Sequence, residues 1–170
     1  MQLDDAATIL SRADFFEVCD AEQRRLLAFA SERKKFRPNA VIYKSGEVPE
    51  GAHVLVSGTV ATLHEGREDD PYLIHESGAV LGAMALVVAK SRPVTLKAID
   101  SVETLFVPRA AFMKLAQQNP DLAARLHGKR CIIRSFQRNK RRLGQDAAGK
   151  QIMRGANINR NAHFGLVELF

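Results

Sequence analysis

The chain has 170 residues, 46% of them hydrophobic and 26% charged, a composition typical of a soluble globular protein rather than a disordered one. No apolar run approaches the roughly 18–20 residues that span a bilayer, and no basic stretch followed by an apolar one marks a secretory signal. Two cysteines, Cys19 and Cys131, stand far apart without a motif, which argues against a disulfide framework or a zinc site. We therefore expect a cytoplasmic protein without a membrane association or a metal.

The net charge of +6 is unevenly distributed along the chain. Residues 1–120 carry 14 Lys/Arg against 16 Asp/Glu, whereas residues 121–170 carry 11 against 3. These counts give balances of −2 and +8. Any electrostatic function is therefore expected in the C-terminal part.

Residues 1–32 are predicted to form the N-terminal helices of the domain. Asp20 is a predicted N-cap, and Gln23 three residues later completes a capping box. The apolar residues that follow, including Leu26, Leu27 and Phe29, fall on one broad helical face.

Residues 33–118 show short apolar runs separated by turn residues, which is the pattern of a β-meander. Pro38 and Asn39 suit the middle of a type II turn, because asparagine tolerates the left-handed conformation. The charged stretch 65–71 (EGREDDP) is predicted to be an exposed loop. Short strands at this spacing, framed by helices, predict a mainly β fold: a jelly-roll barrel, or double-stranded β-helix, with flanking helices.

Helical periodicity returns at Arg109, and Asn119, Pro120 and Asp121 mark the start of a further helix. We expect one long C-terminal helix over residues 119–143, ending at Gly144. The tail, residues 144–170, has little periodicity and is predicted to be partly disordered, although its apolar segment 164–170 (FGLVELF) could dock elsewhere.

An ordered set of landmarks runs through the barrel region, and it resembles the cyclic-nucleotide-binding domain family. Members of that family include the catabolite activator protein, the regulatory subunit of protein kinase A and nucleotide-gated channels. The resemblance covers roughly residues 9–142. Its landmarks are Phe36, Pro38, Val41, Ile42, Gly46, Glu47, the run 54–60 (VLVSGTV), Gly82, Arg92 and Thr95.

Residues 81–95 resemble the phosphate-binding cassette of that family, in which a glycine-led turn precedes an arginine that neutralises the phosphate. The resemblance implies a ligand site for a cyclic nucleotide, cAMP or cGMP, or a related anion. Two residues depart from the family pattern: Ala83 replaces the ribose-binding glutamate, and Pro93 lacks the N–H that would contact the phosphate. Together these changes are expected to weaken nucleotide binding roughly a hundredfold or more. The candidate ligand-binding residues are Gly82, Ala83, Met84, Arg92 and Val94.

The predicted long helix carries two further patterns. Heptad spacing gives a possible homodimer seam, although the same stripe could instead pack on the chain's own barrel. Basic residues without an acidic neighbour form a face that is either solvated or able to bind phosphate backbone. The seam residues are Leu122, Leu126, Ile133, Phe136 and Leu143, and the basic face comprises Lys129, Arg130, Arg134, Arg138, Lys140, Arg141 and Arg142.

Three functions remain open from the sequence. The first is a stand-alone regulatory module that senses a cyclic nucleotide or related anion and signals to a protein partner through its C-terminal helix. The second is a degenerate, non-binding domain that acts as a dimerisation or adaptor element. The third is a non-specific nucleic-acid binder. Sequence-specific DNA binding is not expected, because only 27 residues follow Leu143, whereas a family helix-turn-helix needs roughly 60–70. No catalytic residues, no required cofactor and no enzyme activity are predicted, since no nucleophile motif or P-loop occurs.

Overall fold

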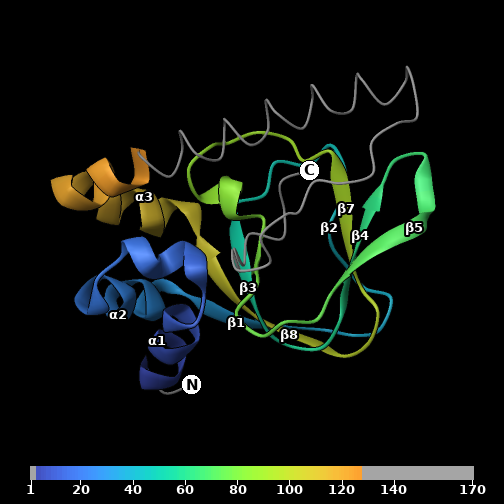
Figure 1. The fold of residues 1–170 in the computed structure, drawn as a ribbon, viewed down its shortest axis with the longest axis horizontal. Coiled ribbons are helices and arrows are strands. Elements are labelled where there is room, and N and C mark those ends of the chain that lie inside the picture. The colour runs from blue at the N-terminus through green and yellow to red at the C-terminus, as the bar shows by residue number, and fades with distance from the viewer. Residues whose placement is uncertain (1–2, 128–170) are drawn as a thin grey trace, which may run out of the picture.

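The computed structural model describes residues 3–127, which form two four-stranded antiparallel sheets with helices packed beside one of them (Figure 1). Sheet A has the strand order β1-β8-β3-β6, and sheet B has the order β2-β7-β4-β5. The prediction of a mainly β jelly-roll fold with flanking helices is confirmed. In chain order the elements are α1 (Leu3–Ser11), η1 (Asp14–Val18), α2 (Ala21–Ala30), β1 (Glu32–Phe36), β2 (Val41–Tyr43), β3 (Gly51–Ser57), β4 (Val60–His64), β5 (Arg67–Ile74), β6 (Val80–Leu81), η2 (Ala83–Leu86), β7 (Val94–Ala98), β8 (Val102–Pro108) and α3 (Arg109–Gln118).

Two predicted local signals are confirmed. At the start of α2, the Asp20 side chain accepts a hydrogen bond from the Gln23 N–H at 2.8 Å. The Gln23 side chain accepts one from the Asp20 N–H at 3.0 Å, which completes the capping box. In the turn between β1 and β2, Asn39 adopts a φ of 68°, and the Ala40 N–H donates to the Arg37 carbonyl. These caps and turns fix where the first helices end and the barrel begins.

The expected loop over residues 65–71 is wrong for most of its length. Strand β5 begins at Arg67, and only the turn around Gly66, which has a φ of 77°, lies outside a strand. The physical reason is the position of β5 at the edge of sheet B. Charged residues and a proline such as Pro71 are tolerated on an edge strand, because one side of that strand has no partner to receive hydrogen bonds.

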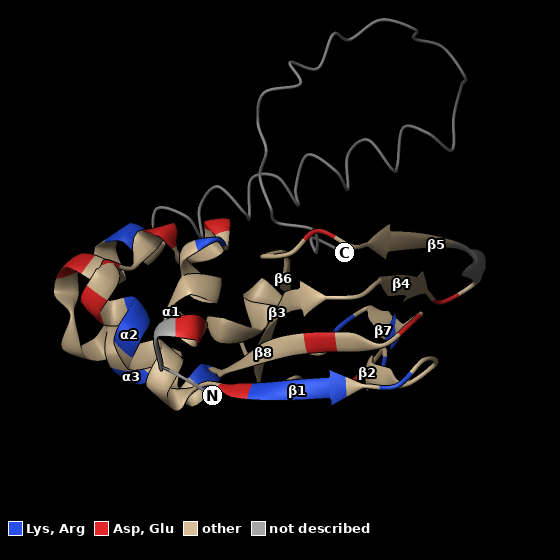
Figure 2. Cartoon of the chain, turned by 90° about the horizontal axis from the view of Figure 1, so that it is seen from below, with Lys and Arg blue, Asp and Glu red and all other residues tan. Residues whose placement is uncertain are grey.

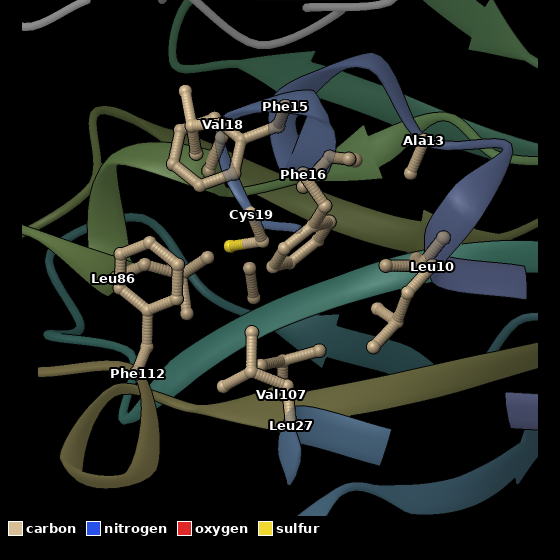
Figure 3. Packing of buried hydrophobic residues seen from close by; sticks show 14 of the residues in the cluster. Leu10, Ala13, Phe15, Phe16, Val18, Cys19, Leu27, Leu86, Val107 and Phe112 are labelled. Atoms are coloured by element: carbon tan, nitrogen blue, oxygen red, sulfur yellow. The ribbon is translucent and has the colours of Figure 1, made fainter. Parts of the chain in front are cut away.

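Hydrophobic residues form two clusters, one on each side of sheet A. The first cluster fills the space between the helices and sheet A, and strand β8 contributes Leu105 and Val107 to it. The second cluster lies between the two sheets, and β8 contributes Val102 to it. Because successive side chains of a strand point to opposite faces of the sheet, β8 contributes residues to both hydrophobic clusters. Figure 3 shows part of the first cluster, where Phe15 and Phe16 of η1 meet Phe112 of α3.

A buried histidine lies inside the barrel on sheet A. The Nδ1 atom of His53 lies 2.9 Å from Thr104 Oγ1, and its ring packs between those of Phe36 and Phe106, with centroids 5.7 and 5.0 Å away. Burial, and to a smaller extent the positive charge of Lys34, together lower the pKa of His53 to about 4. His53 is therefore a neutral core residue at physiological pH.

The helices are joined to sheet A by an ion-paired arginine on β1, a strand rich in basic residues (Figure 2). Arg33 binds Asp5 of α1 and Glu103 of β8 at the same time. Arg33 therefore links the first helix to two strands of the barrel.

The chain is helical again after α3, over residues 120–127. Leu122 and Leu126 of this segment belong to the first cluster, so the segment packs against the same core as the other helices. Among residues 3–127, no helix has both the length and the apolar character required to cross a membrane.

Candidate phosphate-binding site

The cassette begins with a glycine in a left-handed conformation. Gly82, between β6 and η2, has φ 75° and ψ 32°, which a residue with a Cβ adopts only with strain. This turn directs the chain from sheet A into the short helix η2. The side chains of Ala83, Ala85 and Leu86 are fully buried, and Met84 is half-buried. Apolar side chains thus anchor the cassette to the core.

Arg92 lies across from that turn and is held there by its backbone. Its N–H donates to the Glu47 carbonyl at 2.9 Å, and its carbonyl accepts from the Gly46 N–H at 2.8 Å. Its Nη2 donates to the Gly82 carbonyl at 2.9 Å, so the guanidinium is placed beside the glycine turn of the cassette.

One donor of this guanidinium has no partner. Arg92 Nε is buried and makes no hydrogen bond. A buried donor left unsatisfied costs about 1–3 kcal/mol, so such atoms are rare unless a ligand or water supplies the acceptor. Arg92 Nε thus remains available to donate to an acceptor, and a guanidinium can bind phosphate or carboxylate oxygens through several N–H groups at once.

The loop between β2 and β3 is fixed around Arg92 by side-chain hydrogen bonds. The Ser45 N–H donates to Thr95 Oγ1 at 3.0 Å, and the Lys44 N–H donates to a Glu47 carboxylate oxygen at 2.9 Å. These bonds hold Glu47, whose carbonyl accepts from the Arg92 N–H, and the residue before Gly46, so the loop that pairs with Arg92 is fixed on both sides of that glycine.

A second arginine connects the cassette to the C-terminal helices. Nη1 of Arg109, the first residue of α3, donates to the Ala85 carbonyl at 3.2 Å and to the Pro49 carbonyl at 2.9 Å. The Arg109 N–H also donates to the Glu50 carbonyl at 2.8 Å. Arg109 therefore joins η2, the β2–β3 loop and the start of α3.

The structure places the predicted cassette residues together, but it gives them different roles. Ala83 is fully buried in the first cluster and offers no acceptor to a sugar hydroxyl. Pro93 is exposed and has no N–H to donate. Val94 is buried at the start of β7, where it packs in the second cluster. Arg92 is thus the one charged side chain among the five predicted ligand residues, and the ligand role of all five stays a prediction.

The predicted dimer seam is only partly described. Leu122 and Leu126 are buried in the domain's own first cluster, as the alternative of intramolecular packing expects. The other three seam residues, Ile133, Phe136 and Leu143, lie outside the described residues, as do the tail 144–170 and every residue of the basic face: Lys129, Arg130, Arg134, Arg138, Lys140, Arg141 and Arg142.

Two residues were not predicted from the sequence: Arg109, which contacts the cassette, and the buried Thr62. Thr62 of β4 is buried with its hydroxyl unpartnered, and the signal was available as a polar residue at an inward-facing position of an apolar strand. Arg109 left no signal in the sequence, because its partners are backbone carbonyls far away along the chain. Among residues 3–127, no group of three or more His, Cys, Asp or Glu side chains could hold a metal ion.

Comparison with known proteins agrees with this geometry. The family model for the cyclic nucleotide-binding domain matches residues 33–119, which include both sheets and the cassette. The chain belongs to the cyclic nucleotide-binding domain family. Among solved structures, a cyclic nucleotide-binding-like protein from Brucella abortus is 31% identical in sequence to this chain and has a TM-score of 0.57. The alignment covers 66% of this chain and 98% of the Brucella chain.

Two further similarities extend the comparison. The regulatory domain of Toxoplasma gondii protein kinase A in complex with cAMP has a TM-score of 0.58 at 21% identity, covering 75% of this chain and 50% of that one. The lysophospholipase nte1 of Emericella nidulans is 29% identical over 93 residues, or 54% of this chain. The match spans only 6% of that lysophospholipase, so it concerns one domain of a much longer protein.

Proposed function

We propose that this chain is a regulatory ligand-sensing module whose Arg92 binds the phosphate of a cyclic nucleotide or a related anion. The observation that carries the proposal is the buried, unpartnered Nε of Arg92 beside the left-handed turn at Gly82. Membership of the cyclic nucleotide-binding domain family supports the same ligand class. The chemistry is binding rather than catalysis, and the proposed location is the cytoplasm.

Titration calorimetry with cAMP and with cGMP tests this proposal. The cAMP titration comes first because the similar Toxoplasma domain was crystallised with that nucleotide. Replacing Arg92 by alanine is expected to weaken binding about tenfold to a hundredfold, since a hydrogen bond to a charged group contributes about 1.5–3 kcal/mol.

The matched control is Lys90→Ala, which removes a positive charge from an exposed residue two positions before Arg92. We expect the control to bind like the unmutated protein. The proposal fails if the unmutated protein gives no binding heat at millimolar nucleotide, or if the two variants lose affinity equally.

Signalling to a partner is proposed to pass through the C-terminal helices. Arg109 supports this route, because it contacts both the cassette helix and the loop beside Arg92. In this proposal a homodimer forms through Ile133, Phe136 and Leu143, whereas Leu122 and Leu126 serve the intramolecular core.

A test of the dimer is light scattering of the unmutated chain and of Phe136→Glu. We expect the unmutated chain to have twice the monomer mass and the variant to shift toward the monomer, because a charge in an apolar seam is not compensated. A dimer that tolerates Phe136→Glu would show that the seam lies elsewhere.

A further inference from the structure

The face of sheet B that points away from sheet A carries a row of mostly apolar side chains. Residues paired directly across an antiparallel sheet project from the same face. One such row crosses the strands in the order β5-β4-β7-β2 and consists of Leu73, Ala61, Lys97 and Val41. None of these four residues belongs to the hydrophobic cluster between the two sheets, which draws on alternate residues of the same strands. The row therefore lies on the outside of the barrel.

The ends of this row are open to solvent. Among residues 3–127, the helices pack on sheet A, on the side of the molecule away from sheet B (Figure 1). Val41 and Leu73 are 41% and 49% exposed. Ile99 lies just beyond β7, where its N–H donates to the Thr59 carbonyl and the strand alternation turns its side chain outward. It is 45% exposed, so three aliphatic side chains are accessible on one face.

The middle of the row is a buried alanine beside a lysine. Ala61 is 1% exposed although it belongs to neither of the two hydrophobic clusters, so it is covered by its neighbours on the outer face. Lys97 is half-buried, and a lysine stem can cover apolar surface while its ammonium group stays in water. We call this surface the outer patch; it comprises Val41, Ala61, Leu73, Lys97 and Ile99.

The chain contains a segment whose composition matches the outer patch. Residues 164–170 read FGLVELF, and Glu168 is the one charged residue among them. Glu168 is also the only acidic residue in the stretch 147–170, which carries three basic ones. An apolar segment with one carboxylate complements an apolar patch with one ammonium group, and such pairing favours one partner and one register over others.

The length of the segment fits the outer patch. The row spans three strand spacings of about 4.8 Å each, or about 14 Å in all. Seven extended residues span about 20 Å, so the segment can cross the whole row.

The chain before the segment is long enough to reach the patch. Residues 127 and 164 are 37 positions apart, a length that spans roughly 30 Å as a flexible coil and more than about 100 Å when extended. A domain of this size is roughly 35 Å across. The segment can therefore reach the outer patch of its own chain, and the tether holds it at an effective concentration of the order of millimolar.

We propose that residues 164–170 dock on the outer patch of their own chain, with the Glu168 carboxylate beside the Lys97 ammonium group. The apolar side chains of the segment cover the three exposed aliphatic residues of the patch. The contact uses neither Arg92 nor the predicted dimer seam, so it is independent of the proposed ligand and of the proposed dimer.

Methyl NMR spectroscopy with a soluble paramagnetic probe measures whether the patch is covered. In the full chain, the methyl groups of Val41, Leu73 and Ile99 are expected to show relaxation enhancements at least about threefold below that of Leu26. Leu26, a 56% exposed residue of α2, is the internal reference for an uncovered aliphatic side chain. A chain that ends at residue 163 should show values like that of Leu26 at all three positions. Equal enhancement in the full and the shortened chain overturns the proposal.

A charge exchange tests the pairing of Lys97 with Glu168. Lys97→Glu turns a surface attraction into a repulsion and is expected to lower the ratio of docked to undocked segment by about fivefold. Combining it with Glu168→Lys restores opposite charges and should restore the shielding. The matched control is Lys114→Glu, which makes the same change at an exposed position of α3 and should leave the shielding unchanged. Shielding that survives Lys97→Glu, or that the double variant fails to recover, overturns the proposal.

Two further measurements distinguish the chain's own segment from that of a second copy. An intramolecular contact gives the same shielding over about a twentyfold range of protein concentration. Shielding that grows with concentration assigns the patch to a contact between copies. The variant Phe136→Glu, designed to break the proposed dimer seam, is expected to keep the shielding, and its loss there would assign the segment to the other protomer. Either result overturns the proposal. If the segment docks but no nucleotide binds, the proposed function falls and this inference stands.

Discussion

Replacing Phe112 by alanine is expected to lower the free energy of unfolding by about 3–5 kcal/mol, a large part of the 5–15 kcal/mol typical of a domain. The Phe112 ring is fully buried, and its centroid lies 5.8 Å from that of Phe15 and 6.1 Å from that of Phe16 (Figure 3). Truncation removes these aromatic contacts and leaves a cavity between η1 and α3, where surrounding helices can collapse only in part.

Urea unfolding followed by circular dichroism measures this loss. The control is Phe29→Ala, because Phe29 also lies on a helix but is 83% exposed. We expect that variant to change the free energy of unfolding by no more than about 0.5 kcal/mol. A loss below about 1.5 kcal/mol for Phe112→Ala would contradict the central position given to this ring.

Acid is expected to destabilise the domain through His53. The folded-state pKa of His53 is lowered from 6.5 to about 4, chiefly by burial and also by the charge of Lys34. Below pH 6.5 the unfolded chain binds a proton at this residue, whereas the folded chain does not until the pH nears 4. Stability is therefore lost as the pH falls through this window, by roughly 3 kcal/mol in total and about 2 kcal/mol between pH 7 and pH 5.

The measurement is the urea midpoint at pH 7 and at pH 5 for the unmutated chain and for His53→Gln. Glutamine can still pair with Thr104 but carries no proton to exchange in this range, so most of the pH dependence should disappear. His75→Gln, at an exposed position, serves as the control and should keep the full dependence. An equal acid sensitivity in all three proteins would remove His53 as the cause.

Local signals in the sequence predicted local structure well. The capping box at Asp20 and the left-handed Asn39 are set by residues within a few positions of one another, and both are confirmed. The wrong expectation for residues 65–71 has the opposite origin. Whether a charged segment forms a loop or an edge strand depends on which strand lies beside it, and β4 pairs with it through long-range register.

In the candidate site too, features set by neighbouring residues could be predicted from the sequence, whereas features set by long-range contacts could not. Gly82 and Arg92 could be found because the cassette is contiguous and its spacing is characteristic of the family. Thr62 stands out in the sequence as a polar residue in an apolar strand, but that its hydroxyl is buried without a partner is a tertiary property that only the structure shows. The Arg109 contacts are unpredictable from sequence for the same reason: any residue can provide the backbone carbonyls that the guanidinium binds.

The two carbonyl contacts of Arg109 have a consequence for how such a sensor is tuned. If ligand binding strengthens the attachment of η2 to α3 through Arg109, thermodynamic linkage requires the converse by the same factor. A protein that binds α3 and strengthens this attachment would then raise the affinity of the cassette for its ligand without contacting the ligand. A partner could in this way set the ligand concentration at which the module responds. The same module could then respond at different ligand concentrations in complexes with two different partners.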